Sequence, residues 1–225
     1  MLAQRGPAAD PLVRENTTSK VAAHTYVIPD NNVGLVPNVG IVVGTRATLV
    51  IDPGLGRRNG EAELRKDVVQ RKADITFDRA YTLDLGGVRV QFLVVGPTHT
   101  RGDTGFFVEG DNVLFSGDVV MNQSFVAANA ASSMRAWLAA FDAFETFTPT
   151  VVVPAHGPIG DGSIVGINRG FMQEIQARAR ELKAQGQAID AIAMTIQMEQ
   201  QAKHPMWARA NGVAAAARAA YNEAP

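Results

Sequence analysis

Short apolar runs separated by glycine-containing turns dominate the chain between residues 21 and 157, and this pattern predicts β-strands. Many of the runs are rich in valine and isoleucine, which favour strands. Three pairs of runs are joined by connections short enough for hairpins, at residues 44–46, 86–87 and 110–111. A further apolar run at residues 150–156 has no such partner. We therefore expect a body built largely from β-hairpins.

A helical spacing of apolar residues replaces the strand pattern toward the C-terminus. After residues 132–133, two serines that can cap a helix, apolar side chains recur three and four residues apart. We interpret this stripe as core; it comprises Met134, Trp137, Leu138, Phe141 and Phe144. Beyond it we expect a helix from Ile167 to near Gly186. A second helix should end before His204, and an alanine-rich closing helix should cover residues 207–221.

The remaining segments are connections. Residues 1–20 are polar, contain two prolines and show no periodicity, so we expect an extended arm. Residues 52–60 are expected to form a loop, and residues 61–72 a short charged helix. No repeat occurs and no linker is long or polar enough to divide the chain, so residues 21–225 should form one α/β domain. A chain of this size buries roughly 70% of the surface that it exposes when unfolded.

Charge and hydropathy narrow the range of partners. The chain has 21 Lys and Arg residues against 22 Asp and Glu, and no basic run marks a surface for phosphate backbones, so nucleic acid is not expected. No apolar run approaches the ~18 residues of a membrane span, so we expect a soluble protein without a membrane partner. Residues 2–4, Leu-Ala-Gln, are also compatible with the end of a removed export signal, which leaves a periplasmic and a cytoplasmic location open.

The chain has no cysteine. Disulfides, thiolate metal sites, iron–sulfur clusters and a cysteine nucleophile are therefore excluded, and any metal must be bound by His, Asp, Glu or water. No Gly-x-Ser-x-Gly sequence is present, so a serine hydrolase of that type is not supported either.

Three apolar runs end in side chains that can bind a divalent cation: "QFLVVGPTH" ends at His99, "NVLFSGD" at Asp118 and "TVVVPAH" at His156. In α/β proteins, sites form beyond the carboxyl ends of strands. Two imidazoles and a carboxylate leave one position open on Zn²⁺, which is the ligand count of a catalytic site, and water bound there has a pKa of about 7. A lone histidine after a strand is more often a turn residue. A metal site is favoured here because His99, Asp118 and His156 all lie at the ends of apolar runs.

Other polar residues are better explained by structure. His24, on the first expected strand, is interpreted as a surface or packing residue. His204 precedes a proline at a helix end, where a cation suits the helix dipole, so we expect a capping role. Asp103 lies in the turn after His99 and should anchor this loop by hydrogen bonds, behind the candidate ligands.

Four segments resemble successive motifs of the metallo-β-lactamase superfamily and follow the order of that family: "NVGIVVGTRATLVIDPG", "LGGVRVQFLVVGPTHTRGDTGFFV", "NVLFSGDVV" and "VVVPAHG". The resemblance implies an αββα sandwich with a hydrolytic site for one or two metal ions and, in this chain, a helical C-terminal tail. By the same resemblance, His99 matches the third histidine of the first metal site and His156 the last histidine of the second. Asp118 matches the carboxylate that often bridges both metals, and Asp52 an acidic residue that supports the site from behind.

The chain departs from the family pattern in one segment. The motif His-x-His-x-Asp-His normally lies where this chain has only "LGRRNGEAELRKDVVQRKADITFDR", and no His-x-His occurs anywhere. We therefore expect a shortened N-terminal half, and an internal deletion near residues 60–75 is one way in which it would arise. A natural deletion, an engineered or aberrant product and an omitted segment are the three explanations. The three remaining ligands would hold one zinc ion at most, with reduced affinity and rate.

Two functions follow as hypotheses. In the first, the chain derives from a zinc-dependent hydrolase of a small-molecule substrate, in which metal-bound hydroxide attacks an ester, thioester, lactam or similar bond. In the second, it is a non-catalytic homologue that acts as a binding or assembly module. Loss of a strand would leave an unpaired sheet edge that supports a homodimer, unless the helical tail covers the edge with Met194, Met198 and Trp207.

Overall fold

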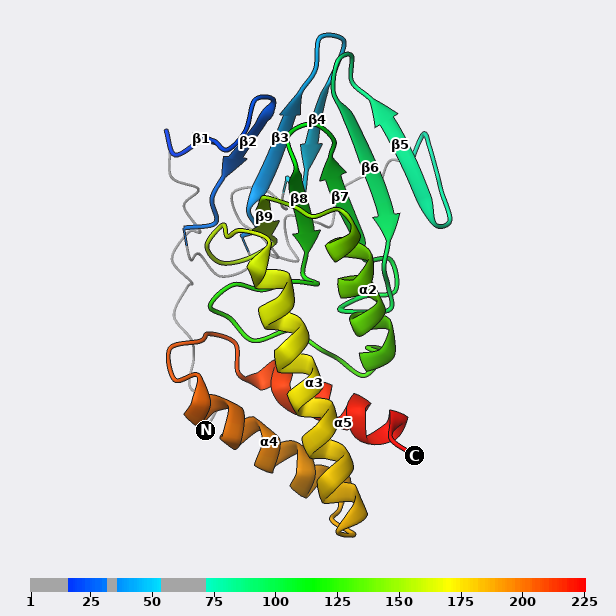
Figure 1. Cartoon of the computed structure of the whole chain (residues 1–225), viewed down its shortest axis with the longest axis vertical. Coiled ribbons are helices and arrows are strands. Elements are labelled where there is room, and N and C mark those ends of the chain that lie inside the picture. Colours follow the sequence, from blue (N-terminus) through cyan, green and yellow to red (C-terminus); the bar gives the residue numbers. More distant parts are fainter. Residues whose placement is uncertain (1–15, 32–35, 54–71) are drawn as a thin grey trace, which may run out of the picture.

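The computed structural model describes residues 16–31, 36–53 and 72–225. In this part of the chain two β-sheets pack face to face, and helices lie against one of them and extend beyond its end (Figure 1). The first sheet has the strand order β1-β2-β3-β4, and all its neighbouring strands are antiparallel. Its strands are β1 (Ser19–Lys20), β2 (Thr25–Ile28), β3 (Val39–Val43) and β4 (Thr48–Ile51).

The second sheet has the strand order β5-β6-β7-β8-β9. Its strands are β5 (Ala80–Asp84), β6 (Arg89–Val94), β7 (Thr104–Val108), β8 (Val113–Gly117) and β9 (Val151–Pro154). Only β8 and β9 are parallel, and a helical crossover connects them, as a parallel pair requires. The expected hairpins are confirmed as β3–β4, β5–β6 and β7–β8.

Alternate side chains of both sheets fill the space between them, as expected for strands with one covered face. This inner core comprises Val27, Val42, Ile51, Leu85, Val88, Val90, Val108, Val113, Phe115 and Val153. The sheets approach closely at Gly40 of β3, where an added Cβ would lie 2.4 Å from the ring of Phe115. A side chain at this position would therefore push the two sheets apart.

Four helices are described: α2 (Met134–Thr146), α3 (Ser163–Ala184), α4 (Ile189–Lys203) and α5 (Asn211–Glu223). Helices α2 and α3 lie near the second sheet, and α4 and α5 pack on α3 at the end of the molecule remote from the hairpin turns (Figure 1). The side chain of Ser133 caps α2 by accepting a hydrogen bond from the backbone N–H of Ala136 at 3.1 Å. The stripe of α2 is core, as expected; Met134, Trp137, Phe141 and Phe144 are fully buried and Leu138 is partly buried.

The helix boundaries differ from the expected ones at two places. Helix α3 begins at Ser163, earlier than Ile167, and the closing helix begins at Asn211 rather than at Trp207. The delay has a physical cause, because residues 204–207 form a turn in which the N–H of Trp207 donates to the carbonyl of His204 at 3.1 Å. Residues 1–15 of the expected arm, and the expected loop and helix over residues 54–71, lie outside the described residues.

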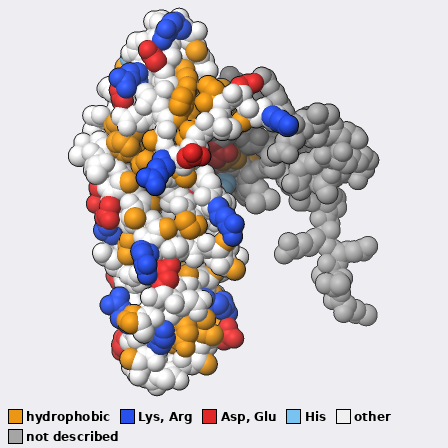
Figure 2. Space-filling view, turned by 90° about the vertical axis from the view of Figure 1, so that its right-hand side faces the viewer, with side chains coloured by type: hydrophobic (Ala, Val, Ile, Leu, Met, Phe, Trp, Pro, Cys, Tyr) orange, Lys and Arg blue, Asp and Glu red, His pale blue; other side chains and the backbone are white. Residues whose placement is uncertain are grey.

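Two packed sheets with C-terminal helices confirm the expected α/β fold class. On the face that Figure 2 shows, acidic and basic side chains are interspersed over the helical end, and hydrophobic side chains gather toward the sheets. No helix in the described ranges is both long enough and apolar enough to cross a bilayer.

Candidate metal centre

The strand ends that carry His99, Asp118 and His156 meet at one edge of the second sheet. Strand β7 is antiparallel to β6 and β8, and β9 is parallel to β8, so β6, β8 and β9 run in the same direction and end at the same edge. Nε2 of His99 lies 3.8 Å from Oδ2 of Asp118, and Nε2 of His156 lies 3.8 Å from Oδ1 of the same residue. The carboxylate therefore lies between the two imidazoles, with one oxygen toward each.

His99 is held by the loop that follows β6. Its Nδ1 is hydrogen-bonded to the backbone carbonyl of Ala127, and its own carbonyl accepts a hydrogen bond from the amide of Asn129. The loop is closed by Asp103, whose carboxylate accepts hydrogen bonds from the hydroxyl of Thr98 and, at 2.9 Å, from the backbone N–H of Thr100. Asp103 thus ties together both residues adjacent to His99, as the turn pattern predicted.

His156 is held by two buried polar residues that the sequence did not single out. Nδ2 of Asn38 donates to the carbonyls of Pro154 and Gly157, each at 2.9 Å, and so clamps the loop that carries His156. The carboxylate of Asp30 accepts a hydrogen bond from the N–H of Gly157 at 2.9 Å. Oδ1 of Asn38 in turn accepts the N–H of Asp30 at 2.8 Å, so the two residues form one support. Their only sequence signal is a polar residue close to a proline, which is typical of any turn.

The two imidazoles share an orientation that leaves Nε2 available. Nδ1 of His156 lies 3.0 Å from the carbonyl of Val36, and Nδ1 of His99 contacts the carbonyl of Ala127. A carbonyl only accepts, so each Nδ1 must carry the proton, and in a neutral ring Nε2 then has a free lone pair. Backbone carbonyls hold metal-binding histidines in the same way.

Asp118 is directed into the site by the backbone before it. Gly117, the last residue of β8, has a φ of +57°, and the register between β8 and β9 shifts there. Because a left-handed conformation costs glycine little, the chain can turn sharply at this point. Oδ1 of Asp118 is buried and has no hydrogen-bond partner within the described part of the chain. An unsatisfied buried carboxylate oxygen is uncommon and is a position that a cation would stabilise.

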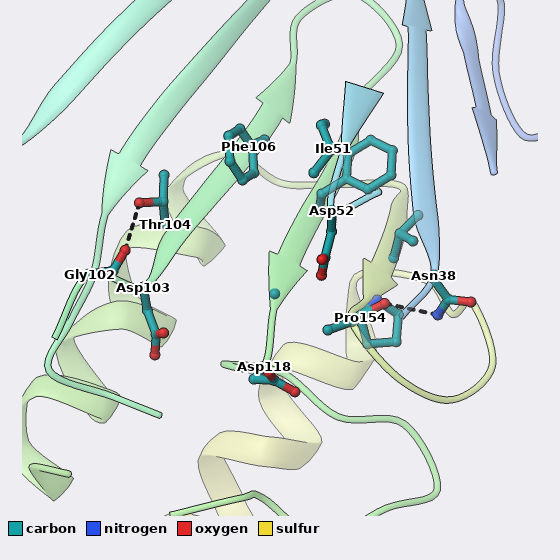
Figure 3. A pocket seen from close by; sticks show the side chains of 13 residues that line it. Asn38, Ile51, Asp52, Gly102, Asp103, Thr104, Phe106, Asp118 and Pro154 are labelled. Atoms are coloured by element: carbon teal, nitrogen blue, oxygen red, sulfur yellow. Dashed lines mark hydrogen bonds between the residues drawn. The ribbon is translucent and has the colours of Figure 1, made fainter. Parts of the chain in front are cut away.

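Asp52 approaches the same region from the first sheet. It directly follows β4, adopts a φ of +52° and points toward Asp118 (Figure 3). Burial raises the pKa of the Asp52 carboxyl, the charge of Asp118 raises the pKa further, and His156 partly opposes both effects. Asp52 therefore holds a proton more readily than an ordinary aspartate.

A pocket of about 390 Å³ opens between the ends of the two sheets, with Asp52, Asp103 and Asp118 around it (Figure 3). Its floor is apolar, because Ile51, Phe106 and other sheet residues line it. A small number of polar groups over an apolar floor is typical of sites for small molecules.

The other two histidines lie apart from this site. Nδ1 of His24 lies 3.0 Å from Oδ1 of Asp111, so His24 has a structural contact, as its interpretation as a packing residue requires. His204 occupies the C-cap of α4, but its ring stacks on Trp207 with centroids 4.1 Å apart. Burial and the charge of Lys203 lower the pKa of His204, with Glu174 opposing them. The expected position at the helix cap is therefore confirmed, while the lowered pKa means that the ring becomes charged less readily than an ordinary histidine.

The donor atoms fit zinc in kind, since they are two imidazole nitrogens and a carboxylate around an unpartnered oxygen. They are few in number. Each carboxylate oxygen faces one imidazole, and the described residues contain no group of three or more His, Asp or Glu side chains arranged to hold a metal ion. Among the described residues these three side chains therefore supply donor atoms of the right kind but do not enclose an ion.

Comparison with known proteins agrees with this geometry. The family model of the metallo-beta-lactamase superfamily matches residues 58–156, a range that includes all three candidate ligands. No curated protein matches the chain in sequence. A metallo-beta-lactamase from Pontibacter korlensis is 18% identical, with a TM-score of 0.56 over 69% of this chain and 98% of that one. The DIM-1 metallo-beta-lactamase exposed to ceftazidime is 16% identical, with a TM-score of 0.53 over 72% of this chain and 97% of that one.

At these identities the solved structures establish a shared fold. The family model adds the match in sequence, over the segment that places His99, Asp118 and His156 at one sheet edge. By sequence over residues 58–156 and by fold, the chain is thus similar to the metallo-β-lactamase superfamily.

Proposed function

We propose that this chain is a metallohydrolase with an incomplete set of metal ligands, and that it binds one zinc ion through His99, Asp118 and His156. The superfamily fold supports a metallohydrolase-type or related function. The single observation that carries the proposal is the position of the Asp118 carboxylate between two Nε2 atoms, 3.8 Å from each. Both imidazole rings present the free lone pair of Nε2 to this carboxylate, because their Nδ1 atoms are hydrogen-bonded to backbone carbonyls.

Each residue has a separate task in this proposal. His99 and His156 would donate their Nε2 lone pairs, and Asp118 would offer one oxygen on each side. A bound zinc ion would supply Lewis-acid catalysis of hydrolysis. Asp52, at the end of β4 and directed toward Asp118, would support the site from the first sheet and border the pocket. The substrate bond would be an ester, thioester, lactam or similar bond.

The ligand number predicts a weak site. Catalytic zinc sites have three protein ligands on one ion, whereas the His99 and His156 nitrogens here face different oxygens of one carboxylate. Zinc binding should consequently be weaker than in a complete site, and hydrolysis slow. Hydrolysis depends more than zinc binding on the His-x-His-x-Asp-His motif that this chain lacks.

Metal content tests the binding part. The full chain is loaded with Zn²⁺, dialysed and measured by elemental mass spectrometry, together with His99→Ala, His156→Ala and the control His24→Asn. The control keeps a donor beside Asp111 and lies apart from the site. We expect about one zinc per parent and control chain and a loss in both site variants. Zinc retained in both site variants would place the ion elsewhere and contradict the proposal.

Hydrolysis tests the catalytic part separately. Parent protein with added Zn²⁺ or Mn²⁺ is assayed on an activated ester, a thioester and a β-lactam, with the His156→Ala variant as background. Slow turnover above the variant is expected for one of the three. If zinc binds but no substrate is cleaved, the chain is a metal-binding homologue without activity.

A second candidate function is assembly through the free edge of the first sheet. Among the described strands, β4 lies at the end of the order β1-β2-β3-β4 with no neighbour beyond it. Val50 of β4 is 49% exposed and Val43 of β3 is 40% exposed, so apolar side chains accompany the free edge. Free edges pair readily with another strand. The helical tail lies at the opposite end of the molecule, and Trp207 packs on Phe125, so the expectation that Trp207 covers this edge is wrong (Figure 1).

The occupant of the edge would be a second copy of the chain, with two β4 strands antiparallel about a twofold axis. Sedimentation velocity over a range of concentrations should detect a dimer that Val50→Lys dissociates. Ile167→Lys is the matched control, since Ile167 is 52% exposed on α3. A strictly monomeric parent would rule out this assembly.

A further inference from the structure

A second pocket lies on the other side of His156, between the strand ends and the C-terminal helices. Its volume is about 340 Å³, which suits a small organic molecule. Polar residues from two distant segments line it, including Asn122, Gln123 and Arg209. His156 is common to this pocket and to the candidate metal centre, so the two sites adjoin.

The backbone fixes the two segments against each other. The N–H of Phe125 donates to the carbonyl of Ala208 at 2.9 Å, and the N–H of Ala208 donates to the carbonyl of Gln123 at 3.3 Å. Ser124 and Ala208 form a parallel β-bridge. The turn between α4 and α5 is thereby attached to the loop that follows Asp118. Backbone hydrogen bonds therefore hold the two sides of this wall together.

Two residues of this wall adopt strained backbone conformations. Gln123 has a φ of +56° and Arg209 a φ of +64°, in the left-handed region that non-glycine residues rarely occupy. Such strain is kept where the surrounding structure imposes it, and it is enriched at binding sites. Here the inter-segment hydrogen bonds lie at Gln123 itself and at Ala208, the residue before Arg209.

Arg209 is half-buried and has no acidic partner among the described residues. Other arginines of the helical part do have partners: Arg169 pairs with Asp142 and Glu145, Arg178 with Glu181 and Glu199, and Arg218 with Asp190. The side chain of Gln123 also makes no hydrogen bond within the described ranges. The pocket therefore contains a cation and an amide with unused donors.

The acidic residue of the pocket does not neutralise this cation. Asp30 is only 7% exposed, and its carboxylate accepts a hydrogen bond from the N–H of Gly157 and lies 3.9 Å from Nδ1 of His156. Asp30 is thus engaged on the side of His156. A ligand that enters the pocket would meet the donors of Arg209 and Gln123 instead.

We propose that this pocket binds the anionic group of a small organic acid, with Arg209 as the principal contact and Gln123 as a second donor. The planar guanidinium suits carboxylate and phosphate oxygens, which it can contact in pairs. His156 borders both this pocket and the candidate metal centre, so small organic acids would be the class of substrate that the metal centre hydrolyses. This assignment of a substrate class, unlike the anion binding itself, rests on the proposed function.

The test uses the full chain freed of metal with a chelator, so that anion binding is measured independently of zinc. Phenylacetate, phenyl phosphate and the uncharged phenylacetamide are titrated by calorimetry into the parent, Arg209→Gly and the control Arg180→Ala. Glycine accepts the φ of residue 209 without strain, so this variant should fold. Arg180 is an exposed arginine on α3, away from the pocket.

We expect the parent and control to bind one or both anions, with the affinity reduced at least tenfold in Arg209→Gly, and to bind the amide much more weakly. A preference for phenyl phosphate would identify a phosphate-type ligand and a preference for phenylacetate a carboxylic acid; either supports the proposal. Unchanged anion affinity in Arg209→Gly, or equal affinity for the amide, would overturn it. Zinc content of Arg209→Gly should equal that of the parent, so a failure of the metal site is recorded separately.

Discussion

The carboxylate of Asp111 accepts two hydrogen bonds from His24, from the backbone N–H at 2.8 Å and from ring Nδ1 at 3.0 Å. It also accepts the hydroxyl of Thr25 at 2.6 Å, and the Asp111 side chain is only 2% exposed. Asp111 is in the turn between β7 and β8, whereas Thr25 is the first residue of β2 and His24 directly precedes it. This one carboxylate therefore joins the two sheets of the sandwich.

Asp111→Ala should consequently destabilise the fold. Three donors would lose their acceptor: the backbone N–H and the ring Nδ1 of His24, and the hydroxyl of the buried Thr25. Unsatisfied buried donors cost about 1–3 kcal/mol, so we expect the free energy of unfolding to fall by about 2–3 kcal/mol in urea denaturation. Asp84→Ala, which removes an exposed carboxylate paired with Arg46, is the control and should cause a smaller change. Equal effects would show that the link between the sheets is not strong.

The same carboxylate predicts loss of stability in acid. Burial would raise the pKa of Asp111, but hydrogen bonds from Thr25 and His24 outweigh it and lower the pKa below its ordinary range. The unfolded chain then takes up this proton first, so the contribution of Asp111 is present above about pH 4 and is lost as the pH falls further. Unfolding free energies measured from pH 6 to pH 3 should decline more steeply in the parent than in Asp111→Asn. Parallel pH profiles would contradict this assignment.

Gly157→Ala should disturb the candidate metal centre without changing a ligand. Gly157 has a φ of +93°, and an added Cβ would lie 2.5 Å from the carbonyl oxygen of Asn122. We expect a loss of about 2–3 kcal/mol in stability, together with reduced zinc retention because His156 is displaced. Gly166→Ala, at an open position on α3, should instead stabilise by roughly 0.5–1 kcal/mol. Normal zinc retention in Gly157→Ala would show that the loop adapts.

Asn38→Asp removes the donors that clamp the loop of His156. A carboxylate cannot donate to the carbonyls of Pro154 and Gly157, and it would add a charge beside Asp30. Supports of this kind are worth roughly 10- to 100-fold in metal affinity, so zinc binding by calorimetry should weaken by roughly tenfold or more. Asn222→Asp, at an exposed position on α5, should bind zinc as the parent does.

The stack of His204 on Trp207 predicts a fluorescence titration. The pKa of His204 is lowered by burial and by Lys203, so the ring should become protonated only below its usual midpoint of ~6.5. We expect tryptophan emission to change as the pH falls through that lower midpoint, and the change to be absent in His204→Gln. In the His24→Asn control it should persist. Since the unfolded chain is protonated first, the histidine contributes to stability above pH ~6.5 and this contribution is lost as the pH falls.

Much of the fold could be predicted because its signals are local. Glycine turns marked the hairpins, and the spacing of Met134, Trp137, Phe141 and Phe144 marked the buried face of α2. His99, Asp118 and His156 were found because each lies at or shortly after the end of an apolar strand. The common direction of β6, β8 and β9 then explains why they meet.

The residues that escaped prediction act over long sequence separations. Asn38 holds a loop more than a hundred positions away, and Asp111 meets His24 from the opposite sheet. Nothing in the pattern around either residue distinguishes it from an ordinary turn residue. Arg209 was missed for the same reason, since its pocket exists only where Gln123 and Ala208 are hydrogen-bonded.

All three candidate ligands follow strands of the second sheet, which makes the connection from β4 to β5 a suitable place for grafting. A donor segment with two additional histidines, inserted between Pro53 and Lys72, would leave every existing ligand on its own strand. Loop closure becomes only about 0.6 kcal/mol less favourable for each doubling of loop length, so the scaffold should tolerate such an insertion. The chain thus offers a starting point for rebuilding a hydrolase one ligand at a time, with the contribution of each added histidine measured against the same background.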